Sequence, residues 1–407
     1  MYLLRFKSIF QMQSKNEPNL KPIIEKIENF AKFNLLIIHS SSDDNVFRHK
    51  SFSRILWVLM TRIVIFLSIL RFGLTVIIST ESMRTVLFNF FYLMGDSKLI
   101  SSAITLVLVS QLTIEITAIY QERIHNFALL RILYMLKYKL IKYPLSANNY
   151  RKLCARLNIL SKYSLFVFNT LLVVFLNIIH LIMTLIMYST LEKTFVTTLT
   201  LIVSNVLAFI NITQIFALLW TAFCLFFLGS VYLKMKFTEI NDRIAKSIEQ
   251  KDIKLLMYSI AEHNYVEKLT QDFNKYFSIC IFILYYFETI GFLIGFFGIH
   301  KSDTTFIGRI ILGVIVSTCF TAIIALNLMC TWVVTAAHKP YSSLITIINK
   351  RILMTVGQRI KLLSFIEKLS GREIGFYCYD LFPMNNYEFY QYLYIAGCNY
   401  FLLMDLF

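Results

Sequence analysis

Residues 194–233 read TFVTTLTLIVSNVLAFINITQIFALLWTAFCLFFLGSVYL and carry no Asp, Glu, Lys or Arg between Lys193 and Lys234. A helix that crosses a bilayer needs about 20 apolar residues, so we interpret residues 196–226 as a transmembrane helix. All five prolines lie outside this and the other apolar stretches, which can therefore keep the unbroken backbone hydrogen bonding that lipid requires. Six further stretches have a comparable character, namely 55–79, 99–120, 163–189, 277–299, 306–334 and 387–407.

The basic residues are distributed unevenly among the segments that connect these stretches. Of 40 Lys and Arg residues, 33 lie before residue 55 or in the segments 122–162, 233–275 and 335–386, and 4 lie in the alternate segments. Basic loops stay in the cytoplasm. The sequence therefore predicts an all-α membrane protein of seven transmembrane helices, with a cytoplasmic N-terminus, an extracellular C-terminus and cytoplasmic helical extensions. The same distribution explains the net charge of +16 without a nucleic-acid partner.

These assignments divide the chain into four parts. A cytoplasmic segment (1–54) precedes helices one to six (55–334), cytoplasmic anchor helices occupy 335–386, and the seventh helix occupies 387–407.

Two cytoplasmic loops are expected to be helical. The loop 122–162 has nine basic residues and one acidic residue, Glu122, a composition typical of segments that lie on anionic lipid. The loop 233–275 has eight basic and seven acidic residues, with apolar residues at helical spacing, and we place Glu262 and Glu267 on its polar face.

No motif for enzymatic or metal chemistry is found. The seven cysteines form no CxxC pair and read as reduced, space-filling thiols. HExxH, GxSxG and phosphate-binding glycine loops are absent from the sequence. We therefore expect neither an enzyme nor a bound metal or cofactor.

The last nine residues, 399–407, read NYFLLMDLF and resemble the end of insect gustatory receptors. That family closes with Thr-Tyr, five hydrophobic residues and Gln-Phe, and Tyr400 and Phe407 match this pattern. The departures are Asn399 in place of Thr, Asp405 within the hydrophobic five, and Leu406 in place of Gln.

Other parts of the chain agree with this resemblance. Residues 378–386 (CYDLFPMNN) and the helix that leads into the fifth span, with Glu262, His263 and the residues 274–277, are similar to the family's corresponding segments. Length, span number and orientation also fit, so the resemblance covers the whole chain. Insect odorant receptors share this topology and are the nearest alternative.

The resemblance implies a ligand-gated, non-selective cation channel. It implies a tetramer, of one or of several kinds of subunit, with the seventh helix of each subunit lining a single pore and cytoplasmic helices forming the subunit interface. The ligand would be a small-molecule tastant, bound in the outer half of each subunit. Membrane lipid would be the second partner, and the plasma membrane of a sensory neuron dendrite the location.

The seventh helix supplies the predicted pore and gate residues. Leu393, Ala396, Tyr400, Leu403 and Phe407 share one helical stripe, which would otherwise be a packing face against neighbouring helices. By resemblance, Phe407 narrows the pore and gates it by dewetting. The predicted pore and gate residues are Tyr400, Leu403, Asp405, Leu406 and Phe407.

Two of these residues change what the pore is expected to do. Leu406 removes the family's amide, so we expect weak function alone and a partner subunit that supplies the polar group. Asp405 and the terminal carboxylate would concentrate cations at the outer mouth, although Asp405 could also simply reach interfacial water.

Polar and aromatic side chains in the outer halves of three helices predict a ligand pocket, since small-molecule sites combine aromatic walls with a few polar groups. Such polar residues also serve as interhelical hydrogen-bond partners. The predicted pocket residues are Asn177, His180, Thr184, Tyr188, Asn205, Phe292, Phe296 and Phe297.

Two other classes of membrane protein fit less well. A G-protein-coupled receptor has the opposite orientation, and no Asp-Arg-Tyr or NPxxY motif occurs. A transporter tends to show repeated halves and spans broken by Gly or Pro, and neither is evident.

Overall fold

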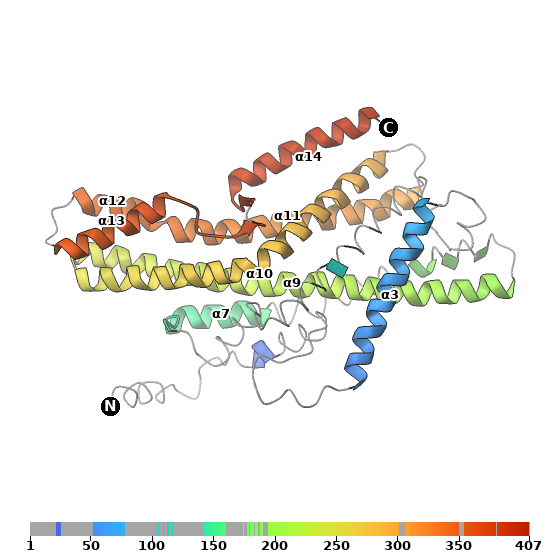
Figure 1. Cartoon of the computed structure of the whole chain (residues 1–407), viewed down its shortest axis with the longest axis horizontal. Coiled ribbons are helices and arrows are strands. Elements are labelled where there is room, and N and C mark those ends of the chain that lie inside the picture. The colour runs from blue at the N-terminus through green and yellow to red at the C-terminus, as the bar shows by residue number, and fades with distance from the viewer. Residues whose placement is uncertain are drawn as a thin grey trace.

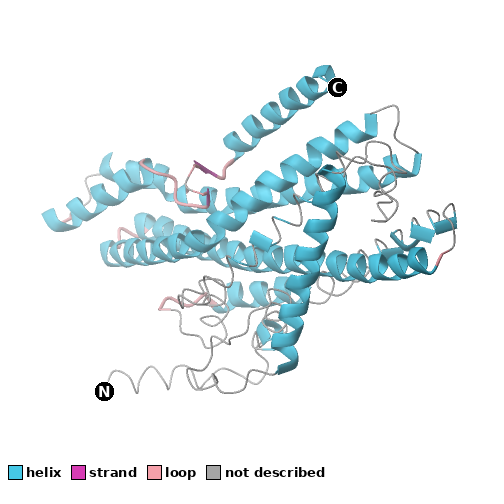
Figure 2. Ribbon diagram, turned by 45° about the vertical axis from the view of Figure 1, so that its right-hand side comes forward, coloured by secondary structure: helices cyan, strands magenta, loops and turns pink. Residues whose placement is uncertain are grey.

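The computed structural model describes residues 22–25, 52–77, 142–159, 194–300, 306–349, 354–379 and 381–406, with scattered positions between 105 and 116 and between 174 and 189. These residues are almost entirely helical (Figures 1 and 2). The fold is all-α, as predicted. The main helices are α3 (Phe52–Ile77), α7 (Ala147–Ile159), α9 (Phe195–Glu249), α10 (Ile253–His300), α11 (Phe306–His338), α12 (Pro340–Asn349), α13 (Val356–Ser370) and α14 (Asn386–Leu406).

Two helices are far longer than a bilayer is thick. α9 has 55 residues and α10 has 48, and at 1.5 Å per residue they extend about 80 and 70 Å. The hydrocarbon core of a bilayer is about 30 Å thick. Each helix therefore joins a predicted span to a long predicted cytoplasmic extension without a break, and α9, α10 and α11 pack along one another (Figure 1).

The described helices agree with the seven predicted membrane spans only in part. Within the described residues, one helical stretch, Cys319–Ile348, has both the length and the apolar composition of a span, while Thr198–Asn211 and Thr289–His300 are apolar but shorter. The predicted spans 99–120 and 163–189 lie largely outside the described residues. The number of spans and the positions of the termini therefore stay predictions.

The chain turns sharply between α11 and the last helix. Pro340 opens α12, where its missing N–H is tolerated. Thr355 caps α13, because its hydroxyl accepts from the Gln358 N–H at 3.3 Å and the Gln358 side chain accepts from the Thr355 N–H at 2.9 Å. A hairpin of β1 (Tyr377–Cys378) and β2 (Phe382–Pro383) then leads into α14.

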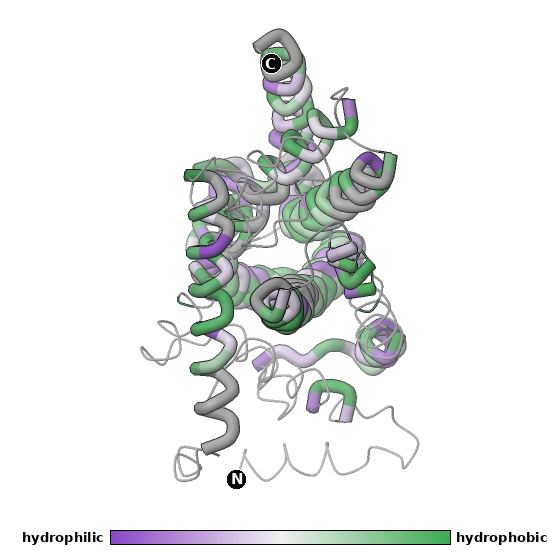
Figure 3. The backbone as a smooth tube through the Cα atoms, turned by 90° about the vertical axis from the view of Figure 1, so that its right-hand side faces the viewer, coloured by the Kyte–Doolittle hydropathy of each residue, from purple (hydrophilic) through white to green (hydrophobic). Residues whose placement is uncertain are grey.

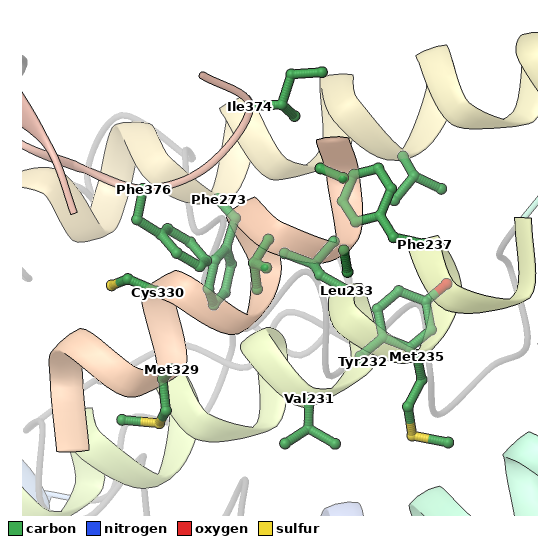
Figure 4. Close-up of a cluster of buried hydrophobic side chains, with 14 of the residues drawn as sticks. Val231, Tyr232, Leu233, Met235, Phe237, Phe273, Met329, Cys330, Ile374 and Phe376 are labelled. Carbon is green, nitrogen blue, oxygen red and sulfur yellow. The ribbon is translucent and has the colours of Figure 1, made fainter. Parts of the chain in front are cut away.

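A buried aromatic core joins the middle of α9 to α10 and to the hairpin segment (Figure 4). The ring of Phe226 lies 4.7 Å from that of Phe376, and the rings of Phe273 and Phe277 lie 4.5 Å apart. Phe273 also packs directly on Gly229, where a Cβ atom would overlap the ring. Glycine is required at that position because the α10 aromatic ring fills the space of a side chain.

The predicted polar face of α10, which includes Glu262 and Glu267, packs on other helices of the protein. Both are buried, because α10 is covered by α9 on one side and by α13 on another. Their charges are met by Lys236 and Arg243 of α9 and by Lys368 of α13. The polar positions of this helix are thus interior ion pairs.

Candidate ligand-binding and pore-lining residues

Three of the predicted pocket residues form a hydrogen-bonded group, here called the polar cluster (His180, Thr184 and Asn205). Nδ1 of His180 lies 3.1 Å from Oδ1 of Asn205, and the Thr184 hydroxyl lies 3.2 Å from the same oxygen. His180 and Thr184 are buried. The cluster therefore ties His180 and Thr184 to the N-terminal part of α9.

Two further predicted pocket residues flank this cluster. The hydroxyls of Tyr188 and Thr198 lie 2.9 Å apart, and Asn177 is half-buried. Since the polar cluster residues and Tyr188 already bond to protein groups, the arrangement serves interhelical packing as it stands. A ligand would bind here by exchanging one of these bonds.

The predicted aromatic residues lie in a different place, between α10, α11 and α14. The rings of Phe292 and Phe296 stack with centroids 5.7 Å apart, and Phe320 of α11 lies 5.6 Å from Phe292. Phe296 meets Tyr400 of α14 edge to face at 4.7 Å, and His300 lies 5.9 Å from the same tyrosine. We call Phe292, Phe296, Phe320, His300 and Tyr400 the aromatic cluster.

The predicted pocket is thus divided between two groups of contacts. Phe297, the third predicted aromatic residue, is buried. Phe320 and His300 were missed. Phe320 joins the cluster from α11, a contact that spacing within one helix cannot predict, whereas His300 lies four residues after Phe296 on α10 and could have been found by helical spacing. Aromatic clusters of this kind present flat apolar walls with a polar edge at Tyr and His, which suits a small organic molecule.

α14 lies at the outside of the helix assembly in all three views (Figures 1, 2 and 3), and hydrophobic and hydrophilic positions alternate along it (Figure 3). Ala396 is buried, and Tyr400 contacts α10. The predicted pore stripe therefore faces the subunit's own bundle at these two positions. Tyr394 and Phe401, on the opposite side of α14, are 74% and 68% exposed.

The side chains of the remaining predicted gate residues are not among the parts that the structure describes. Leu403, Asp405 and Leu406 belong to α14, but their side chains and the whole of Phe407 lie outside the described residues. On an ideal helix, Asp405 continues the stripe of Tyr394 and Phe401 in steps of three and four residues.

The cysteines differ in accessibility along the chain. Cys398 of α14 is exposed, whereas Cys154, Cys224, Cys330 and Cys378 are buried. Burial raises the pKa of the Cys378 thiol to about 12, which keeps it protonated and unreactive at neutral pH. Cys398 is therefore a natural chemical probe of the exposed side of α14.

A buried ionic network connects α9, α10 and the segment before α7. Nζ of Lys236 lies 2.5 Å from Oε1 of Glu262, whose other oxygen lies 2.6 Å from Nη2 of Arg243. Lys236 also donates to the carbonyl of Pro144 at 2.9 Å, and the Ser146 N–H donates to Glu239 at 3.0 Å. Breaking such a buried pair leaves an uncompensated charge, so the network fixes how these three segments meet.

The fold has known counterparts. Two structures of the insect olfactory receptor OR5 from Machilis hrabei match over 95% of this chain and 99% of theirs. The complex with eugenol has a TM-score of 0.70 at 11% identity, and the structure without it a TM-score of 0.68 at 12%. No protein-family model matches the sequence, and no curated protein matches it either. The likeness is therefore one of fold, and it confirms the expected resemblance to insect chemoreceptors at that level.

Proposed function

We propose that this chain, which has the fold of insect olfactory receptors, is a chemoreceptor subunit that forms a ligand-gated, non-selective cation channel. The observation that carries the proposal is the match of nearly the whole chain to OR5 from Machilis hrabei. The end of the sequence resembles that of insect gustatory receptors at Tyr400 and Phe407, which favours the gustatory branch. An odorant receptor subunit is the second candidate, because the matched structures are olfactory.

The subunit spans the plasma membrane seven times with its N-terminus inside, and four subunits surround one pore. The orientation is supported by the distribution of 33 against 4 basic residues in the connecting segments. The tetramer is what the resemblance to insect chemoreceptors implies. The partner subunits are copies of this chain or related receptors.

The pore is lined by the side of α14 that points away from its own bundle. This choice is supported by the exposure of Tyr394, Cys398 and Phe401, since a face that packs against no part of its own subunit is available to face a central axis. Tyrosine hydroxyls and Asp405 give that face polar groups, which a purely lipid-facing helix would not need. Tyr400 supports α14 from the bundle side.

The outer end of α14 holds the gate. On an ideal helix, Leu403 and Phe407 continue the stripe of Tyr400, so they and Leu406 close the pore by dewetting when α14 turns that side toward the axis. Asp405, on the outward side, supplies negative charge that favours cations.

The ligand is a small organic molecule held in the outer half of each subunit. The aromatic cluster is the better candidate for its walls, because Tyr400 connects it to α14, while the polar cluster supplies hydrogen-bonding groups nearby on the chain. Ligand contact with Phe292 or Phe296 would then act on α14 through a shared ring contact.

The experiment is ligand-evoked current in excised membrane patches without nucleotides, from cells that express the chain alone or with related receptor subunits. The panel contains sugars, bitter alkaloids and eugenol, the molecule bound by OR5 from Machilis hrabei. A cation current that persists without nucleotides is expected. A response that requires guanine nucleotide would contradict a channel.

A further inference from the structure

The imidazole of His338, the last residue of α11, is held between two backbone groups of the chain. Its Nδ1 lies 2.9 Å from the carbonyl oxygen of Leu369 in the last turn of α13, and its Nε2 lies 2.7 Å from the backbone nitrogen of Ile374. A carbonyl only accepts and a backbone N–H only donates, so Nδ1 carries the proton and Nε2 is the acceptor. Both bonds therefore require the neutral ring in this one tautomer.

The N–H that His338 accepts belongs to the first residue of a buried segment, 374–378. Within this segment the ring of Phe376 enters the aromatic core (Figure 4), and the Tyr377 N–H donates to Oδ1 of Asn274 at 2.8 Å. The segment continues through the β1–β2 hairpin into α14. His338 thus fixes the start of the connection between α13 and the last helix.

A second proton on His338 would remove this bond. Histidine is the side chain whose charge changes between pH 5 and 8, and the half-buried ring of His338 is within reach of water. Protonated Nε2 is a donor, and it would face the N–H of Ile374, which is a donor as well. Because Ile374 is buried, its N–H would lose its acceptor unless the segment moved.

The charged and titratable groups around His338 lie on the elements that its bonds join and on α10. They are His263 and Glu267 of α10, Lys339 after His338, Lys368 before Leu369, and Arg372 and Glu373 before Ile374. Both carboxylates already have partners, since Glu267 pairs with Lys368 and Glu373 accepts from Asn385 at 3.1 Å. Among the described residues, no carboxylate pairs with His338. An imidazolium there would lose the Ile374 bond without gaining an ion pair.

We propose that His338 is a proton-operated latch. In its neutral form the ring holds the segment 374–378 to the ends of α11 and α13, and a second proton on Nε2 releases the Ile374 N–H. Acid on the cytoplasmic side thereby loosens the connection that leads into α14. This last step rests on the proposed channel and its orientation, whereas the latch itself rests on the two hydrogen bonds of His338.

The test of the latch is amide hydrogen exchange of the purified full chain in neutral detergent, read by mass spectrometry on overlapping peptides that cover residues 371–379. After correction for the intrinsic pH dependence, exchange at Ile374 should become about tenfold faster or more between pH 7.5 and pH 5.5. His338→Gln keeps an acceptor near the place of Nε2 and does not titrate, so its corrected rate should be the same at both pH values. His263→Gln removes the neighbouring histidine, as the matched control, and should keep the acceleration.

A second variant replaces His338→Gln if that protein does not elute in a folded form. The shorter amide of His338→Asn can donate to the Leu369 carbonyl but leaves the Ile374 N–H without its acceptor. Its exchange at Ile374 should therefore be fast at both pH values.

Two exchange results would overturn the latch. One is an acceleration of the same size in His338→Gln, and the other is its loss in His263→Gln, which would assign the acid response to His263.

Ligand-evoked currents test the link to α14. In outside-out patches with the pipette solution at pH 7.5 or 5.5, the half-maximal ligand concentration of the unmodified chain should differ by about fivefold or more, and that of His338→Gln should not. Equal values for the unmodified chain would overturn the link to α14 even if exchange responds to acid. The lack of any ligand-evoked current would overturn the proposed channel instead, and the exchange experiment stands without it.

Discussion

The rings of Phe296 and Tyr400 meet edge to face with centroids 4.7 Å apart, which connects α10 to the last helix of the chain. Edge-to-face aromatic pairs contribute about 0.5–1.5 kcal/mol beyond the area they bury. The contact gives the aromatic cluster a direct mechanical link to α14. In the proposed channel this pair transmits ligand binding to the pore.

Replacing either ring should alter gating, and replacing both should cost less than the sum. We expect Phe296→Ala and Tyr400→Ala each to shift the half-maximal ligand concentration, with a coupling energy of about 1 kcal/mol between them. Dose–response currents of the two single variants and the double variant measure this. Phe306→Ala, at a position of α11 that is 78% exposed, serves as the control. If the shifts of the two single variants are simply additive in the double variant, the contact between the two rings does not contribute to gating.

Cys398 should report the pore directly. Because it is exposed on the outward side of α14 and the other described cysteines are buried or half-buried, a charged methanethiosulfonate reagent applied from outside should reduce cation current within minutes. Modification should be faster with ligand present, and Cys398→Ser should abolish the effect. Full labelling of Cys398 without any change in current would place this side of α14 away from the ion path.

Asp405→Asn should reduce cation selectivity and divalent block. Four carboxylates at one mouth raise the local cation concentration, and the amide removes that charge with little change in shape. Reversal potentials in asymmetric salt measure the first effect, and current in millimolar calcium measures the second. If both are the same in the variant, Asp405 faces interfacial water.

The free energy of unfolding should fall as the pH is lowered, because His263 is buried in its neutral form. This side chain is buried between Phe237 and Phe365, and its Nε2 lies 2.9 Å from the Ala337 carbonyl oxygen. Burial, and to a smaller degree the charges of Lys368 and His338, lowers its pKa from 6.5 to about 4, against the favourable effect of the Ala337 hydrogen bond. Above pH 6.5 the imidazole ring of His263 is neutral in both the folded and the unfolded chain. Between pH 6.5 and 4, His263 is protonated in the unfolded chain but neutral in the folded chain, so acid favours unfolding.

The expected loss is about 2 kcal/mol at pH 5 relative to pH 7.5, and about 3 kcal/mol below pH 4. Thermal unfolding in detergent across this range measures it. His263→Gln should flatten the slope between pH 6.5 and 5. An identical slope in the variant would assign the acid sensitivity to other groups.

Composition and periodicity were enough to predict an all-helical chain, and the apolar runs located most of the long helices that the structure describes. Contacts between helices were not predictable. Glu262 lies on the polar side of the helical wheel, and its ion pairs with Lys236 and Arg243 of α9, which compensate its charge in the interior, could not be predicted from spacing. His180 and Asn205 were predicted to share one pocket because both lie in the outer halves of their predicted spans, and their side chains are in contact. Tyr400 was expected in the pore, since spacing along α14 defines a stripe but not the side on which α10 will pack.

The most direct test is a density map of the purified chain in lipid nanodiscs. Four copies of α14 around one central axis are expected, with Tyr394, Cys398 and Phe401 directed toward that axis and Tyr400 directed toward α10 of the same subunit. Single subunits, or an assembly in which Tyr394 and Phe401 contact acyl chains, would contradict the proposed channel.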